Sequence, residues 1–251
     1  MQVVRKKPMS NTEWSTRCDL ALCYRLVAHH GLTDQIYTHI SARVPETREQ
    51  FLINPYGLRW DEITASSLVK IDVAGKPIEP TQHEVNEAGF TIHSAVHMAR
   101  EDAGCVLHLH SRASMAVAAL ADGLLPLNQI SMQFYNRIAY HDYEGVSLDI
   151  DERPRIAASL GRHNAMILRN HGTLALGRGV GEAFSRAYYL EKACELQLDA
   201  MATHARLSIP APDVCEHAAR QWDDSCNDKD MRREWDANRR LIDKVNPGYD
   251  R

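Results

Sequence analysis

The chain has 251 residues, of which 44% are hydrophobic and 25% charged, and its formal net charge is -4 at pH 7. This length and composition are ordinary for a globular protein with a substantial core. A mildly acidic chain lacks the basic footprint of a nucleic-acid binder, and its apolar runs fall far short of the roughly 20 residues that a membrane span needs. The basic segment at 1–10 is not followed by an apolar signal core. These features predict a cytoplasmic protein without nucleic-acid or membrane partners.

Helical and strand-like patterns alternate along the chain. Ser10 and Glu13 have the spacing of a capping box, which predicts a first helix that stops near Gly31. Short β-prone runs follow at 36–44, 51–53 and 68–73, the last meeting a turn at 74–76. The periodicity then predicts helices at about 88–100, 114–120, 152–160, 180–205 and 231–245, with strands ending at 110, at 165–168 and at 173–177.

The interleaving of these elements indicates the fold class. Helices alternating with strands and hairpins predict an α/β protein, specifically a three-layer α/β/α sandwich with a largely antiparallel central sheet. The chain contains no internal repeat, low-complexity tract or Gly/Ser linker. We therefore expect a single domain over residues 1–251, with its core at about 11–205 and a polar helical C-terminal extension at 206–251.

Three histidines stand where two apolar runs end. His108 and His110 close the first run, and His171 follows the second. Because side chains two apart on a strand share a face, the first two imidazoles should point the same way, while Leu109 points into the core. Three nitrogen ligands with an open position are a common catalytic metal site. Each histidine alone fits a hydrogen-bonded strand residue, but the three together predict a divalent-metal site.

The same segments resemble the class II aldolase/adducin family. The resemblance is carried by VLHLHS at 106–111, ILRNHG at 167–172 and GEAF at 181–184, with further support at 53–57 and 90–108. It covers about residues 11–205 and implies that family's α/β fold.

In the sugar-phosphate aldolases of this family, histidines at the positions of His108, His110 and His171 hold a divalent metal, usually zinc. The resemblance implies zinc here, with iron or manganese as alternatives. The metal would act as a Lewis acid that stabilises an enediolate formed from a hydroxy-carbonyl substrate.

The chain departs from the sugar-phosphate aldolases close to these matches. Counting back from His108, Gly89 falls where the family has its proton-carrying glutamate, and Glu87 and Ala88 fall at its phosphate-binding serines. His39 takes the place of a phosphate-binding asparagine. An acidic Glu87 would repel a phosphate, so we expect a substrate without one. The segment at 86–90 is closer to the adducin-like branch, which includes cytoskeletal adducins, bacterial proteins of unassigned activity and iron-dependent oxygenases.

The acid–base group must then come from another residue. Glu87 is the candidate base, although an acid at a helix N-terminus is also stabilised by the helix dipole without any catalytic role. Glu84 is a weaker candidate. Tyr135 is the candidate proton donor, within a group that also includes Tyr140 and Tyr143, and packing is the alternative for each.

Four residues are candidates for substrate binding: His39, Asn54, Gly57 and Ser111. Asn54 and Gly57 also fit a simple turn, and Ser111 also fits the N-cap of the following helix. His93 and His97 form a helical i, i+4 pair for which we expect a packing or surface role.

These observations predict a metal-dependent lyase that carries out aldol or retro-aldol cleavage of a small, non-phosphorylated hydroxy-carbonyl compound. Two alternatives stay open: an iron-dependent oxygenase on the same scaffold, and a non-catalytic interaction module like that of adducin. By family resemblance, we expect a homotetramer with sites near subunit interfaces.

Overall fold

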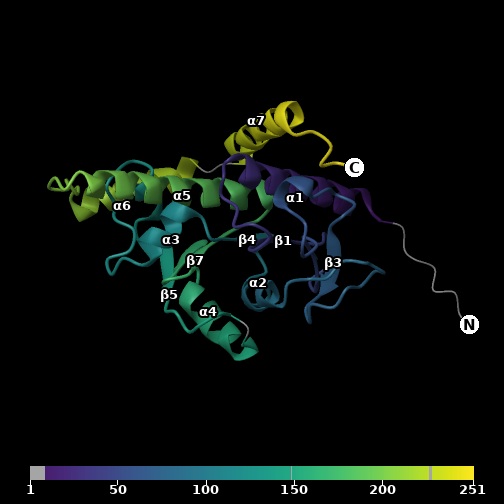
Figure 1. Cartoon of the computed structure of the whole chain (residues 1–251). Helices are drawn as coiled ribbons and strands as arrows, with labels where there is room; N and C mark the ends of the chain where they lie inside the picture. The colour runs from purple at the N-terminus through teal and green to yellow at the C-terminus, as the bar shows by residue number, and fades with distance from the viewer. Residues whose placement is uncertain (1–8, 148, 226–227) are drawn as a thin grey trace, which may run out of the picture.

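The computed structural model describes residues 9–147, 149–225 and 228–251. A seven-stranded sheet lies at its centre, in the order β3-β2-β1-β4-β7-β6-β5 (Figure 1). Neighbouring strands are antiparallel except for the parallel pair β5 and β6. The strands are β1 (His39–Arg43), β2 (Gln50–Ile53), β3 (Val69–Asp72), β4 (Cys105–Leu109), β5 (Ile138–His141), β6 (Ala165–Leu168) and β7 (Gly172–Gly177). The predicted α/β class with a largely antiparallel sheet is confirmed.

Helices cover both faces of this sheet (Figure 1). The long helices α1 and α5 lie on one face, with α7 outside them, and α2 and α4 lie on the other face. The α-helices are α1 (Asn11–His29), α2 (Glu87–Ala99), α3 (Arg112–Ala118), α4 (Arg153–Leu160), α5 (Val180–Ala202), α6 (Pro212–Ser225) and α7 (Asp228–Val245). Short 3-10 helices occur at η1 (Trp60–Glu62), η2 (Ser131–Phe134) and η3 (Ile150–Glu152). Among the described residues, no helix is long and apolar enough to cross a membrane.

Two details of the local structure differ from the sequence prediction. The run at 36–44 forms a strand only from His39 onward, because the Tyr37 amide closes a turn onto the Asp34 carbonyl oxygen at 2.8 Å, and Thr38 has a positive φ of 64° that interrupts an extended backbone. Helix α6 was not predicted, since the tail was expected to be polar with one charged helix. The first helix does begin as predicted, with the Ser10 hydroxyl accepting from the Glu13 amide at 3.1 Å.

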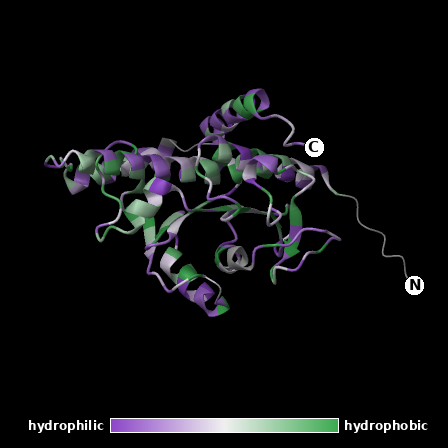
Figure 2. Ribbon diagram, in the orientation of Figure 1, coloured by the Kyte–Doolittle hydropathy of each residue, from purple (hydrophilic) through white to green (hydrophobic). Residues whose placement is uncertain are grey.

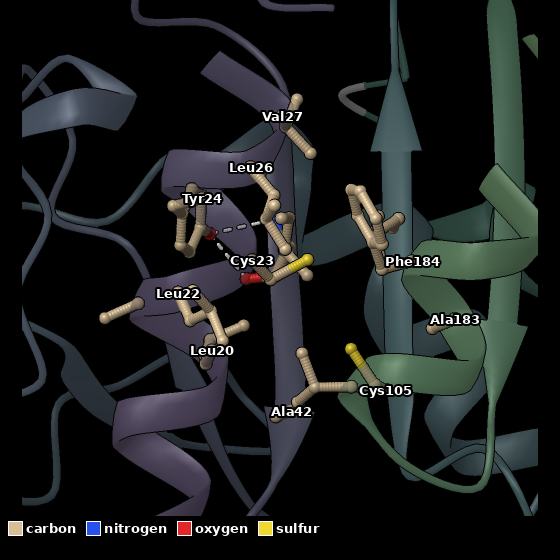
Figure 3. Packing of buried hydrophobic residues seen from close by; sticks show 14 of the residues in the cluster. Leu20, Leu22, Cys23, Tyr24, Leu26, Val27, Ala42, Cys105, Ala183 and Phe184 are labelled. Carbon is tan, nitrogen blue, oxygen red and sulfur yellow. Dashed lines mark hydrogen bonds between the residues drawn. The ribbon is translucent and has the colours of Figure 1, made fainter. Parts of the chain in front are cut away.

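Side chains alternate along β4 between two apolar clusters. Cys105 and Leu107 face α1 and α5, where they pack with Tyr24 and Phe184 (Figure 3). Val106 faces the other way, into the cluster under α2 and α4. His108 shares the face of Val106, because side chains two apart on a strand point the same way. The strand therefore directs His108 toward α2.

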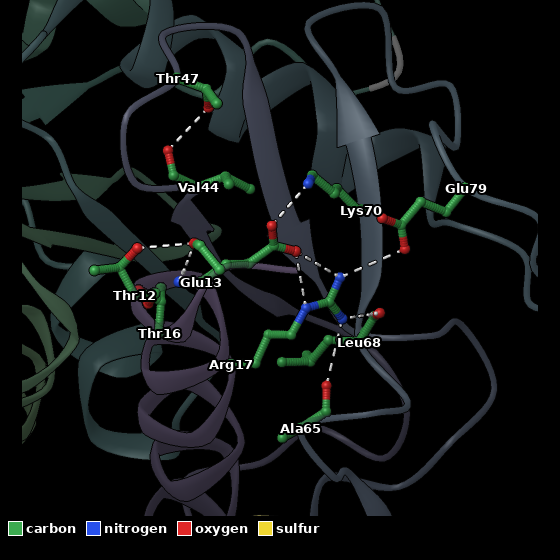
Figure 4. Close-up of polar contacts among 11 residues, drawn as sticks. Thr12, Glu13, Thr16, Arg17, Val44, Thr47, Ala65, Leu68, Lys70 and Glu79 are labelled. Carbon is green, nitrogen blue, oxygen red and sulfur yellow. Dashed lines mark hydrogen bonds and ion pairs between the residues drawn. The ribbon is translucent and has the colours of Figure 1, made fainter. Parts of the chain in front are cut away.

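A buried ionic network anchors the N-terminal end of α1 to β3 (Figure 4). The Glu13 carboxylate lies 3.1 Å from Arg17 Nη2 and 2.8 Å from Lys70 Nζ. Arg17 also donates to the carbonyl oxygen of Leu68 at 2.9 Å. Each buried charge thus has partners of opposite charge or carbonyl dipoles, as burial requires.

The last helix packs on the outside of the helical layer. In Figure 2, α7 carries both hydrophilic and hydrophobic residues. Ile242 is fully buried in the core cluster, and the Trp235 ring lies 6.1 Å from the Phe184 ring on α5. Arg239 pairs with Asp19 of α1 at 2.6 Å. The C-terminal helix is therefore held by apolar and ionic contacts to both α1 and α5.

Candidate metal centre

The structure brings His108, His110 and His171 together at one end of the strands. One imidazole nitrogen from each lies within 4.8 Å of the others. The ring centroids are 4.7 Å apart for His108 and His110, 4.8 Å for His108 and His171, and 4.9 Å for His110 and His171. Histidines from the end of β4 and from the β6–β7 turn therefore converge on one point.

The β6–β7 turn places His171 by backbone geometry. Asn170 has a φ of 57°, a left-handed conformation that asparagine tolerates better than most residues. Gly172 follows, and a Cβ atom there would collide with the carbonyl oxygen of Leu109 and lie 3.0 Å from the His110 ring. The absence of a side chain at Gly172 lets the turn approach β4 closely enough for His171 to join the other two histidines.

Hydrogen bonds determine which ring nitrogen of His108 and of His110 is left free to face the site. His108 Nδ1 donates to the carbonyl oxygen of Thr173 at 3.1 Å, and His110 Nδ1 donates to Asp34 Oδ2 at 3.0 Å. Because these acceptors carry no proton, each neutral ring has an unprotonated Nε2. In the described part of the chain, the buried His110 Nε2 has no hydrogen-bond partner. A carboxylate or carbonyl behind the imidazole and an open nitrogen in front are typical of histidine metal ligands.

Burial keeps these imidazoles in the neutral form that metal binding needs. Desolvation, followed by the neighbouring His171 and His39, lowers the pKa of His108 well below its usual range. Burial and then His110 lower the pKa of His171 to about 4. At neutral pH both rings are uncharged and can offer a lone pair.

His39 lies beside this group. It pairs with His108 across the β1–β4 ladder, and the two rings stack with centroids 5.6 Å apart. His93 and His97, for which packing or a surface role was expected, are both buried on the sheet-facing side of α2, and His93 Nε2 lies 3.1 Å from His39 Nδ1. Ser41 bonds both of these α2 histidines. The substrate-binding role predicted for His39 stays a prediction.

The predicted acid–base residues are only partly described. Glu87 is the first residue of α2, but its side chain and the surroundings of Gly89 lie outside the described part of the structure. Glu84 is exposed. His141 is the last residue of β5 and pairs with Leu168, just before the turn that carries His171. Tyr135 precedes the other end of β5.

The structure therefore does not bring Tyr135 to the three histidines within this chain. The tyrosine that does approach them is Tyr143, whose ring centroid lies 6.4 Å from that of His171. The sequence could not separate the two, because only the direction of β5 decides which end of the strand faces the site.

The other predicted substrate contacts have structural partners. Asn54 is buried, with its Oδ1 2.8 Å from the Tyr24 hydroxyl, while Gly57 lies in an exposed turn with a φ of 99°. The Ser111 hydroxyl donates to Glu191 at 2.6 Å. Glu191 also accepts from two backbone amides at the start of α3, so this glutamate from α5 caps the helix.

Three residues near the site were missed: Asp34, His141 and Glu152. Asp34, the partner of His110, stands outside any recognisable motif. His141 is buried at the end of β5, with its Nδ1 2.9 Å from the Ser159 hydroxyl and its Nε2 3.4 Å from buried Glu152. Only the tertiary fold brings these residues near His110 and His171, and their sequence spacing gave no signal.

A separate cleft of about 720 Å³ opens at the opposite ends of the strands, near Ala165. Three of the arginines that line it are paired with acids: Arg137 lies 2.9 Å from Glu216, and Arg178 and Arg186 lie 3.1 Å and 2.9 Å from Glu182. Such paired charges leave little free potential for binding an anion. The three-histidine group is the better candidate site.

The chain belongs to the class II aldolase and adducin family. The family model described as "Class II Aldolase and Adducin N-terminal domain" matches residues 18–198. The "Putative aldolase class 2 protein" of Caulobacter vibrioides is 47% identical over 244 residues, covering 97% of this chain and 95% of that protein. Rat alpha-adducin is 44% identical over 190 residues, which are 74% of this chain but 26% of the adducin.

Solved structures agree with this assignment. An aldolase II superfamily protein from Pseudomonas syringae superposes with a TM-score of 0.92 at 45% identity, covering 97% of this chain and 98% of that one. An L-fuculose 1-phosphate aldolase from Glaciozyma antarctica superposes with a TM-score of 0.82 at 26% identity, with 97% of both chains covered. The predicted family and fold are confirmed, and the reaction is a separate question.

Proposed function

We propose that this protein is a divalent-metal-dependent lyase whose metal is held by His108, His110 and His171. The observation that carries the proposal is the buried His110 Nε2, which has no hydrogen-bond partner among the described residues and faces two further imidazoles. A buried polar atom without a partner is costly unless something occupies its lone pair. A divalent cation fits that requirement, and three neutral nitrogens suit zinc, with iron or manganese as alternatives.

The substrate we propose is a small hydroxy-carbonyl compound without a phosphate. When bound, the metal would act as a Lewis acid toward the substrate's oxygens and stabilise the negative charge that develops as a C–C bond breaks. His39 and the residues around it would orient the substrate. The similarity to an L-fuculose 1-phosphate aldolase supports aldol chemistry, while His39, Glu87 and Ala88 at the family's phosphate-binding positions disfavour that aldolase's phosphate.

A residue must also move the proton. Glu87 stays our candidate base, because its backbone begins the helix that covers the histidine face of the sheet. Tyr135 could donate a proton only from a neighbouring subunit, since within this chain it lies at the far end of β5. A homotetramer with shared sites is therefore part of the proposal. We also propose a cytoplasmic location.

Turnover assays separate the proposed reaction from its alternatives. Protein loaded with zinc, manganese or iron(II) is offered a panel of small hydroxy-carbonyl compounds, with and without oxygen. Cleavage without oxygen uptake supports the lyase. Oxygen consumption with the iron form supports an oxygenase instead. A folded, metal-loaded protein that turns over no compound of the panel contradicts the lyase and favours an adducin-like interaction module.

The Glu87→Gln variant tests the base. We expect turnover to fall by about 100-fold or more, as for loss of a general base, with metal content unchanged. Glu101→Gln is the control, because Glu101 is an exposed acid just beyond the other end of α2, and it should retain turnover. Unchanged turnover in Glu87→Gln would exclude Glu87 as the base.

A further inference from the structure

A buried chain of hydrogen bonds leads from the start of β4 to the side of the three-histidine group. His97 Nδ1 lies 3.0 Å from the carbonyl oxygen of Ala103, and its Nε2 lies 2.7 Å from the Ser41 hydroxyl. The same hydroxyl lies 2.6 Å from His93 Nδ1, and His93 Nε2 lies 3.1 Å from His39 Nδ1. The four linked side chains are each at most 3% exposed.

The carbonyl at one end sets the direction of every bond in this chain. A carbonyl oxygen only accepts, so His97 must donate from Nδ1. These rings are deeply buried, and no described carboxylate bonds to them, so each is neutral and carries a single proton. His97 Nε2 is then an acceptor, which makes Ser41 the donor in that bond.

The same argument continues to the site. Because its proton is used toward His97, the Ser41 oxygen accepts from His93 Nδ1. His93 Nε2 is then unprotonated and accepts from His39 Nδ1. His39, with its single proton on Nδ1, is left with an unprotonated Nε2. One backbone carbonyl thus determines the protonation pattern of three successive rings.

The position of His39 makes this nitrogen relevant to the site. Its backbone pairs with that of His108, and the two rings stack with centroids 5.6 Å apart. The preceding residue, Thr38, has a φ of 64°, an unusual conformation for a β-branched residue. Strained backbone of this kind is often retained where a side chain must be held in place.

We infer that the chain of His97, Ser41 and His93 fixes His39 as a hydrogen-bond acceptor, and that the site therefore selects a substrate that places a hydroxyl donor against His39 Nε2. A phosphate dianion or carboxylate has no proton to donate and would face a lone pair there. The substrate class is thus a neutral, hydroxyl-bearing carbonyl compound. This inference rests on the proposed function only for the identity of the ligand, since the fixed protonation pattern belongs to the protein alone.

The first experiment measures the protonation pattern directly. Two-bond ¹H–¹⁵N correlation spectra of the metal-free full chain, labelled with ¹⁵N-histidine, distinguish protonated from unprotonated ring nitrogens. We expect Nδ1 protonated and Nε2 unprotonated in His39, His93 and His97. A protonated His39 Nε2 in the wild type would overturn the inference, whatever the protein's metal content.

Removing the serine tests the coupling. In Ser41→Ala we expect His93 and His39 to lose their single pattern and exchange between two. Ser159→Ala is the matched control, because Ser159 makes the same kind of hydroxyl–imidazole hydrogen bond, to His141, but is not part of the hydrogen-bonded series from His97 to His39. An unchanged His39 pattern in Ser41→Ala would contradict the assignment. If Ser41→Ala does not fold, the wild-type spectrum still decides.

The second experiment tests the ligand, with dihydroxyacetone as the probe and zinc-loaded protein. His39→Phe keeps a stacked ring but removes the acceptor, and should weaken dihydroxyacetone binding by about tenfold, the contribution of one hydrogen bond. His39→Gln supplies a carbonyl acceptor and should recover part of the loss. Equal binding by wild type and His39→Phe, or no binding by the wild type, would overturn the substrate class. Failure to bind zinc would contradict the proposed function and leave the first experiment valid.

Discussion

Replacing Asp34 should weaken metal binding although all three histidine ligands are retained. Asp34 Oδ2 accepts the Nδ1 proton of His110 at 3.0 Å, which orients the ring and fixes its unprotonated nitrogen toward the site. In Asp34→Ala the ring loses its orienting partner and can rotate or move its proton to Nε2. The lone pair that would bind the metal is then no longer preorganised.

The structure sets the size of this effect. Loss of a residue that orients a metal ligand commonly reduces metal affinity by about 10- to 100-fold. The Asp34 side chain is 41% exposed, so water can replace part of its hydrogen bond. We therefore expect the lower end of the range, about tenfold or about 1.4 kcal/mol. Asp34→Asn keeps an acceptor oxygen and should lose less.

The assay is zinc competition against a chromophoric chelator at pH 7.5. Asp61→Ala serves as control, because Asp61 lies in η1 and contacts Arg59 rather than a site histidine. The dissociation constant should rise in Asp34→Ala and stay unchanged in the control. Unchanged zinc affinity in Asp34→Ala would refute the idea that this carboxylate orients His110 as a ligand.

Three further changes should alter stability. Glu13→Ala leaves the buried Arg17 with only the more distant and more exposed Glu79 carboxylate, 3.9 Å away, and should lower the free energy of unfolding by about 3 kcal/mol, measured in urea. Gly172→Ala forces a Cβ against the Leu109 carbonyl and should lower both the melting temperature and zinc affinity. Burial lowers the pKa of His97 to about 3, so below about pH 6.5 only the unfolded state binds its proton, and this residue alone should lower stability by about 1.4 kcal/mol per pH unit as the pH falls, in addition to the contributions of the other buried histidines.

Each of these has its own control. Glu62→Ala changes an exposed acid in η1 and should cost far less than Glu13→Ala. A Cβ atom at Gly179 would meet only open space, so Gly179→Ala should leave zinc affinity unchanged. His97→Phe should make the loss of stability between pH 6.5 and 5 shallower by about 1.4 kcal/mol per pH unit, while the other buried histidines still titrate. A cost near zero for Glu13→Ala, wild-type zinc affinity in Gly172→Ala, or an identical pH slope in His97→Phe would contradict the respective argument.

Much of the fold could be predicted because its signals are local. The Ser10 cap, the alternation along β4 and the apolar run at Ala165–Leu168 each depend on near neighbours in sequence. The strand at 36–44 was predicted too long because neither the turn that Tyr37 closes onto Asp34 nor the positive φ of Thr38 is indicated by the residue types there. The amphipathic α6 was hidden by the polar composition of the tail.

The site was predicted only in part, for a related reason. The three histidines carry a short-range pattern and a family frame, so their convergence could be expected. The surrounding partners could not be predicted. Asp34, which orients His110, is 76 positions from it along the sequence, and Ser41, which bonds His93 beside the site, is 52 positions from that residue. Tyr135 was chosen by proximity in sequence, whereas the direction of β5 brings Tyr143 nearer to His171.

The metal content of the purified protein tests the central claim most directly. Protein prepared without added metal should contain about one divalent ion per chain, as expected for a single three-histidine site. His110→Ala should lose that ion, while His163→Gln, a change at a half-buried histidine remote from the motif, should keep it. A well-folded wild-type protein that contains no metal, and takes up none when zinc is supplied, would contradict the account.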